Sequence, residues 1–136
     1  MKRQIEIKII DFVRKNISDV NSIYIFGSYA ANQETPTSDL DIAYLATNKI
    51  DSVKKWEIQE ELASLLDIDV DLVDLQEASV ILRTEVIDKG KLIFSNDKYK
   101  TNYFEMTAYS MYADLNESRA DILNDYKTKY GRDFTK

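Results

Sequence analysis

The chain has 136 residues, a formal net charge of −6 at pH 7, and neither cysteine nor histidine. The missing residue types exclude thiol redox chemistry, His-ligated zinc and the Ser-His-Asp and Cys-His catalytic mechanisms. Because binding to nucleic-acid phosphates needs clustered cations, the acidic balance argues against direct nucleic-acid binding. A chain of this length fits one domain, and we expect residues 1–136 to form it.

Residues 3–16 predict an amphipathic helix that packs on the rest of the chain. Its apolar face carries, at helical spacing, Ile5, Ile9, Phe12 and Val13. Glu6 and Lys8 interrupt the apolar positions, so the segment is neither a signal peptide nor a membrane span. We therefore expect a soluble, cytoplasmic protein without membrane contact.

Residues 22–26 alternate in the period of a strand and stop at Gly27-Ser28. Gly27 lets the backbone approach a ligand without a side chain in the way. Ser28 adds a hydroxyl group, and residues 29–32 are expected to open a short helix whose amides could bind a β- or γ-phosphate. The turn after this strand is therefore a candidate phosphate site.

A second strand, at residues 42–45, follows the sequence Asp39-Leu40-Asp41. In extended backbone residues i and i+2 point the same way, so Asp39 and Asp41 project together. Two carboxylates held this close repel, and each pKa rises unless a cation sits between them. Mg²⁺ prefers oxygen ligands and keeps positions open for phosphate oxygens, which suggests a metal-nucleotide site. The alternative is a hairpin-like crossover whose aspartates only cap and solubilise strand ends.

A helix over residues 51–66 is predicted next, with Asp51-Ser52 as its cap. Trp56 is expected in the core rather than as a base-stacking platform, since tryptophan on an apolar helical face usually packs. The segment that follows, residues 67–75, alternates as a strand does. It is rich in acids, and these form either part of a site or the wet face of an edge strand: Asp67, Asp69, Asp71 and Asp74.

The rest of the chain predicts a helix over residues 76–88, a short strand over residues 91–94 and a C-terminal helical segment over residues 98–130. Arg83 and Lys89 could approach a triphosphate, but charged helical residues are usually solvated, and neither is assigned to the site. The C-terminal segment holds six of the nine tyrosines. Tyrosine suits an interface, where the ring is buried and the hydroxyl stays wet, so we expect protein contact there.

These elements together predict an α+β fold: a small, twisted, mixed sheet of about four strands, flanked by helices, with the carboxylates at one edge of the sheet. The pattern Gly27-Ser28, ten residues, then Asp39-x-Asp41 resembles the signature of the DNA polymerase β-like nucleotidyltransferase superfamily. Within that superfamily it is most similar to the small minimal nucleotidyltransferases.

The resemblance implies a polymerase β-like fold and in-line attack of a hydroxyl on the α-phosphorus of a metal-bound NTP. Asp39 and Asp41 would hold two Mg²⁺ ions, and Gly27 and Ser28 would hold the leaving phosphates. The family carries a third carboxylate on a neighbouring strand, which the resemblance matches to Asp71. Asp69 is the second candidate for that third position.

In size and layout the chain resembles the antitoxin nucleotidyltransferases of HepT/MntA toxin–antitoxin pairs. That resemblance implies AMP transfer from ATP to a tyrosine of a HEPN-domain ribonuclease toxin, which is thereby neutralised, and a hetero-oligomer with the toxin. The family often has Arg-Gly after the Gly-Ser turn, where this chain has Ala31-Asn32. Asn32 can take the left-handed backbone in place of glycine. Two alternatives stay open: a non-catalytic antitoxin that acts by binding, and an enzyme that modifies a small molecule such as an antibiotic.

Overall fold

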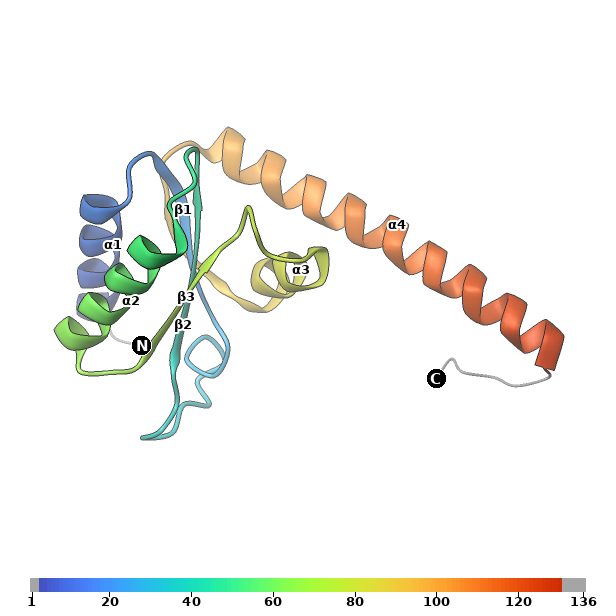
Figure 1. Ribbon diagram of the computed structural model, residues 1–136, viewed down its shortest axis with the longest axis horizontal. Helices are drawn as coiled ribbons and strands as arrows, with labels where there is room; N and C mark the ends of the chain where they lie inside the picture. Colours follow the sequence, from blue (N-terminus) through green and yellow to red (C-terminus); the bar gives the residue numbers. More distant parts are fainter. Residues whose placement is uncertain (1–2, 131–136) are drawn as a thin grey trace.

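The computed structural model describes residues 3–130, with side chains over residues 3–116. One four-stranded sheet forms its centre, in the order β3-β2-β1-β4. Helices α1 (Arg3–Asn16) and α2 (Ser52–Leu66) cover one face, and α3 (Val80–Lys89) covers the other (Figure 1). The α+β fold and the mixed sheet predicted from the sequence are confirmed.

The sheet combines two antiparallel pairs and one parallel pair. Strand β1 (Val20–Phe26) runs antiparallel to both β2 (Leu40–Ala46) and β4 (Lys91–Ser95). Strand β2 runs parallel to β3 (Val70–Asp74). Parallel neighbours need a long crossover connection, and α2 supplies it. As a result β2 and β3 start at the same end of the sheet, where Asp39, Asp41 and Asp71 lie.

Each face of the sheet packs its own apolar cluster. The larger cluster lies under α1 and α2 and includes Ile23, Ile25, Leu40 and Ile42. The smaller one lies on the α3 face and is built on Tyr24, Ala43, Leu75 and Val86. Because side chains alternate between faces along a strand, Asp41 shares its face with Ala43, the face that α3 covers. The larger core thus supports the sheet from behind the acidic residues.

The packing face of α2 differs from the predicted one at Trp56. The helix begins at the predicted place, where Asp51 Oδ1 accepts a hydrogen bond from the Lys54 amide at 2.8 Å. Its buried positions are Ile58 and Leu62, and Trp56 lies about 200° around the helix from Ile58. The Trp56 side chain is 58% exposed, so the expectation of a core tryptophan is wrong.

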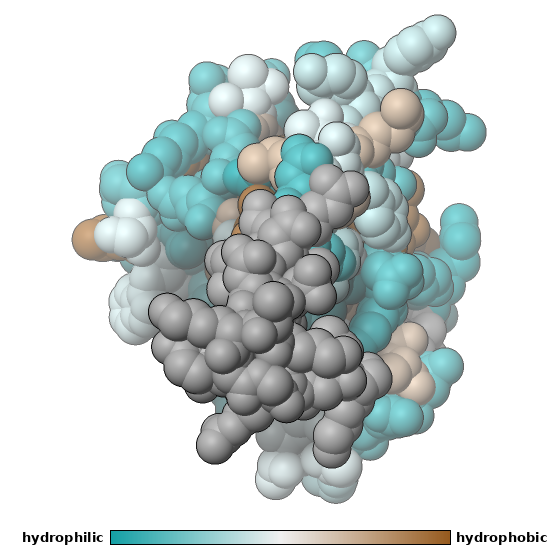
Figure 2. Space-filling view, turned by 90° about the vertical axis from the view of Figure 1, so that its right-hand side faces the viewer, coloured by the Kyte–Doolittle hydropathy of each residue, from teal (hydrophilic) through white to brown (hydrophobic). Residues whose placement is uncertain are grey.

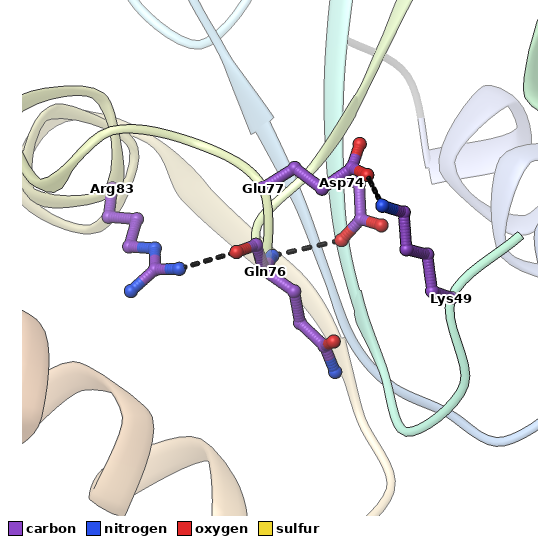
Figure 3. Close-up of polar contacts among 5 residues, drawn as sticks. All are labelled: Lys49, Asp74, Gln76, Glu77 and Arg83. Atoms are coloured by element: carbon purple, nitrogen blue, oxygen red, sulfur yellow. Dashed lines mark hydrogen bonds and ion pairs between the residues drawn. The ribbon is translucent and has the colours of Figure 1, made fainter. Parts of the chain in front are cut away.

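Helix α3 starts four residues later than the predicted position, at Val80 rather than Gln76. Residues 75–78 form turns instead, because side chains satisfy the backbone there (Figure 3). Asp74 Oδ1 accepts from the Gln76 amide at 2.9 Å, and the Arg83 guanidinium donates to the Gln76 carbonyl at 2.6 Å. The helix N-cap is Ser79, whose hydroxyl accepts from the Leu82 amide.

The C-terminal segment is one helix, α4 (Lys98–Tyr130), which projects away from the sheet (Figure 1). Its first turns are tied to β1. Asn21 Nδ2 donates to Thr101 Oγ1 at 3.1 Å, and the Tyr24 hydroxyl donates to Glu105 Oε2 at 2.6 Å. Seen from the side toward which α4 projects, the described surface is mostly hydrophilic with apolar residues interspersed (Figure 2). Over residues 3–130, no helix combines the length and apolarity needed to cross a membrane.

Candidate active site

Strand β1 ends in a turn that is shaped for close approach. Gly27 has φ of +73°, in the left-handed region that glycine adopts most easily. A Cβ atom at this position would overlap Asp41 Oδ2 and would lie 3.2 Å from Asp41 Cγ. The Asp41 carboxylate therefore lies directly against the backbone of the turn. Only glycine leaves room for both.

Residues 27–32 form consecutive turns rather than the predicted short helix. The Ala31 amide donates to the Gly27 carbonyl at 3.2 Å, as in one helical turn. The Gln33 amide then donates to the Ser28 carbonyl at 2.8 Å, and Asn32 has φ of +55°. A left-handed residue at this point ends a helical turn, which is why no helix propagates. The expected left-handed backbone of Asn32 is confirmed.

The predicted carboxylates lie at the shared starting end of β2 and β3. Asp41 and Asp71 are register partners in the parallel pair, so their side chains leave the same face of the sheet. Asp41 is also the register partner of Phe26, the residue before Gly27. Asp39 lies one residue before β2 and is exposed. The fold therefore brings together the glycine turn and three carboxylates from two neighbouring strands.

Burial and the neighbouring carboxylates change the pKa of Asp41. Burial, followed by the negative charges of Asp71 and then Asp39, raises the pKa of the Asp41 carboxyl from 3.8 to about 6. Within residues 3–116, no hydrogen bond and no ion pair engages the side chain of any of the three. An acidic group that is crowded and uncompensated in this way is stabilised by a cation, so the electrostatics match a metal site.

Carboxylate oxygens are the donors that Mg²⁺ prefers, and in that respect the donor set of Asp39, Asp41 and Asp71 fits the ion. In the described conformation, no three acidic side chains of residues 3–116 converge closely enough to hold a metal ion. All three are outside the packed core, with Asp39 and Asp71 exposed. The side chains of Asp39 and Asp71 can therefore rotate toward Asp41, which is half-buried against Gly27.

Asp69 belongs to a neighbouring cleft rather than to this group. Its carbonyl accepts from the Leu40 amide at 2.7 Å, which places it just before β3. Its side chain lines a polar cleft of about 530 Å³ together with residues of α2 and of the loop before Asp39. The lining of that cleft does not include Asp41 or Asp71. The register of the parallel pair thus favours Asp71 over Asp69 as the third carboxylate.

Two polar residues near the strands have roles that the sequence did not indicate. Gln59 Oε1, from α2, accepts from the Leu72 amide at 2.9 Å, which satisfies a donor on the open side of edge strand β3. It thereby holds the strand that carries Asp71. Arg83, whose Nε donates to the Leu75 carbonyl at 2.7 Å, is held beyond the other end of β3. No local pattern distinguishes Gln59 from any other polar residue of a helix.

Comparison with known proteins agrees with this geometry. Residues 7–99 match the family described as "Polymerase beta, Nucleotidyltransferase". The chain is 40% identical over 125 residues to the protein adenylyltransferase MntA of Shewanella oneidensis, covering 92% of this chain and 89% of that protein.

Solved structures indicate the same family. A crystal structure of a toxin–antitoxin with AMP-PNP superimposes with a TM-score of 0.81 at 40% identity, covering 89% of this chain and 97% of the other. The MNT antitoxin in complex with a tri-AMPylated HEPN toxin of Shewanella oneidensis superimposes with a TM-score of 0.78 at 39% identity, covering 93% and 98%. The chain therefore belongs to the Polymerase beta, Nucleotidyltransferase family, among the minimal, MntA-like members.

Proposed function

We propose that this protein is an antitoxin that transfers AMP from ATP to a tyrosine hydroxyl of a cognate HEPN toxin and thereby neutralises it. The observation that carries the proposal is the Asp41 carboxylate lying against Gly27, with Asp71 beside it in register. Its relative at 40% identity is a protein adenylyltransferase. A relative of similar identity is found in complex with an AMPylated HEPN toxin. Because the reaction consumes ATP, we place it in the cytoplasm, in a hetero-oligomer of enzyme and toxin.

The residues of the turn would bind the triphosphate. At Gly27 the phosphates can approach the backbone because no side chain intervenes. The Ser28 hydroxyl would donate a hydrogen bond to a phosphate oxygen of the leaving group. The cation that relatives often carry three positions after the serine of this turn is replaced here by Ala31. The main chain and the bound metal must therefore supply more of the charge neutralisation.

Asp39, Asp41 and Asp71 would hold two Mg²⁺ ions. When bound, these ions neutralise the charge of the triphosphate and acidify the attacking hydroxyl. The tyrosine oxygen forms a bond to the α-phosphorus, the bond from that phosphorus to the bridging oxygen breaks, and pyrophosphate leaves. The Asp71 carboxylate would accept the proton of the tyrosine hydroxyl. Alignment of the two reactants supplies much of the acceleration.

The test is AMP transfer from ATP labelled at the α-phosphate to the cognate HEPN toxin. We expect Mg²⁺-dependent label on the toxin, and loss of that label with Asp39→Ala or Asp41→Ala. If both variants label the toxin as the wild type does, the proposed chemistry is wrong. Mass spectrometry of the toxin identifies the acceptor residue, and an AMP group found on a residue other than tyrosine contradicts that part of the proposal.

An assay in cells distinguishes neutralisation by binding alone from neutralisation by catalysis. A protein that acts by occlusion would protect cells from the toxin even as the double variant Asp39→Ala/Asp41→Ala. We expect this variant to lose protection while it still co-purifies with the toxin. Incubation with labelled ATP and aminoglycosides tests the small-molecule alternative, and we expect no labelled drug.

A further inference from the structure

We propose that an apolar groove on the catalytic face anchors the acceptor protein and so sets which of its tyrosines reaches the active site. The groove is formed by Leu45, Tyr99, Lys100, Tyr103, Phe104 and Thr107. This inference rests on the proposed protein-modifying function and adds to it a place where the protein substrate is recognised away from the reacting atoms.

The groove is open to solvent although its lining is almost entirely apolar. Its volume is about 460 Å³, which is large enough for one or two side chains of a partner. The side chains of Tyr99 and Tyr103 at its rim are 88% and 75% exposed, and Met106 continues the same stripe of α4 at 71%. Such a concentration of exposed aromatic surface is typical of a protein-binding site.

The groove lies on the same face of the same strand as the catalytic carboxylate. Leu45 is four residues after Asp41 in β2, so the two side chains leave the same face of the sheet. Four residues of extended strand span about 13 Å. Ala43, which lies between the two on this face, is buried in the cluster under α3, so a partner seated in the groove extends past α3 to reach Asp41. A protein that must present a residue to Asp41 can use this shared face, which points to the acceptor protein as the occupant.

The groove is also held rigidly relative to the sheet. Its α4 wall is fixed by the hydrogen bond from the Tyr24 hydroxyl to Glu105 and by the one from Asn21 to Thr101. Tyr24 and Asn21 both belong to β1, which pairs directly with the strand that carries Asp41. A partner held on this wall has a defined distance and direction to the active site, as a selective protein-modifying enzyme requires.

The charge of the groove indicates which partner side chains are complementary to it. Lys100 is the single charged residue among the six that line the groove, whereas the catalytic end of the sheet is acidic. A complementary partner therefore inserts an apolar or aromatic side chain and carries a carboxylate next to it, facing Lys100. In the partner this anchor lies at least about 13 Å from the acceptor tyrosine, the spacing of four strand residues.

The experiment measures AMP transfer to the cognate HEPN toxin by the double variant Tyr99→Ser/Tyr103→Ser. Both side chains are exposed, so the fold is not at risk. We expect KM for the toxin to rise at least tenfold, as for the loss of interface hot-spot residues, with kcat and KM for ATP changed less than twofold. The matched control is Trp56→Ser, an exposed aromatic residue on the opposite face, which should leave every constant unchanged.

The variant Lys100→Glu tests the charge prediction, and we expect it to raise KM for the toxin in the same way. An unchanged KM for the toxin in the Tyr99→Ser/Tyr103→Ser variant, with wild-type transfer present, overturns the groove but not the enzyme. Absence of transfer by the wild type overturns the proposed function itself. If sedimentation shows that the wild type alone forms a dimer that the double variant abolishes, the groove binds a second copy and the inference is wrong.

Discussion

The two ends of the parallel pair β2 and β3 carry the same kind of residue in opposite states. At the far end, Asp74 is buried and accepts a hydrogen bond from the Gln76 amide, and Glu77 pairs with Lys49 at 2.7 Å (Figure 3). At the starting end, Asp41 faces two further carboxylates, and its pKa is raised to about 6. Acids with partners support the fold, whereas crowded acids without partners among the described residues indicate a binding site for a cation.

The contrast between the two ends of β2 and β3 is tested most strongly by one substitution at each end. Asp41→Asn removes a proposed metal ligand, and we expect AMP transfer to the toxin to fall about 10³-fold, equivalent to about 4 kcal/mol. Asp74→Asn should change transfer less than about threefold, although it lowers the free energy of unfolding by about 1 to 3 kcal/mol. Rate assays and urea unfolding of the two variants provide both values. Equal losses of transfer would remove the distinction between the ends.

The close approach at the starting end is tested by Gly27→Ala. A methyl group here meets Asp41, and alanine at φ of +73° is strained. We expect transfer to fall about 10²-fold and the free energy of unfolding to drop by about 1 to 3 kcal/mol. Asn32→Gly is the matched control, because glycine adopts its left-handed backbone without strain and should keep the stability within about 0.5 kcal/mol.

The burial of Asp41 and the crowding of carboxylates around it predict a dependence of stability on pH. The pKa of Asp41 is higher in the folded state, at about 6, than the ordinary value of 3.8. The folded protein therefore binds the extra proton between these values, and this group contributes stability that is present below pH 3.8 and is lost as pH rises through about 6. In metal-free protein, we expect Tm of the wild type minus Tm of Asp41→Asn to increase as pH falls from 7 to 4.

Saturating Mg²⁺ should reduce this pH response, since a bound cation favours the ionised carboxylate. A difference in Tm that stays flat over the same pH range in the metal-free protein would show that the neighbours do not act on Asp41.

The smallest effect is expected at the surface pair of the far end. Lys49 and Glu77 are both largely in solvent, and exposed ion pairs contribute little. Lys49→Ala should leave both the midpoint of urea unfolding and AMP transfer almost unaltered. A large loss of transfer would mean that the Lys49–Glu77 pair itself takes part in function.

Much of this arrangement could be predicted from local sequence, because the deciding interactions are local. The alternation of residues 22–26, the cap at Asp51 and the pair Asp39 and Asp41 each show their structure within a few positions. The resemblance then supplied Asp71, and the parallel register places it beside Asp41. The C-terminal segment is helical as predicted, and Tyr99 and Tyr103 at its start are exposed, while the side chains of Tyr126 and Tyr130 lie outside the described residues.

The features that were missed depend on contacts between distant segments. Trp56 lies on a helix with apolar residues on more than one side, and only the docked position of α2 decides which side is buried. The late start of α3 depends on Arg83 reaching back to the Gln76 carbonyl. Gln59 matters only because β3 is an edge strand, whose Leu72 amide has no strand on that side to accept its hydrogen bond. None of these can be read from a period or a propensity.

The central claim is that the carboxylates at the starting end of β2 and β3 share divalent metal. Crystals of the protein grown with AMP-PNP and Mn²⁺ test it directly through anomalous scattering. The account predicts two manganese peaks among the carboxylates of Asp39, Asp41 and Asp71, next to the Gly27 turn, and none in Asp39→Asn/Asp41→Asn crystals grown in the same way. Manganese bound elsewhere, such as at Asp74 and Glu77, with those three carboxylates free, would contradict it.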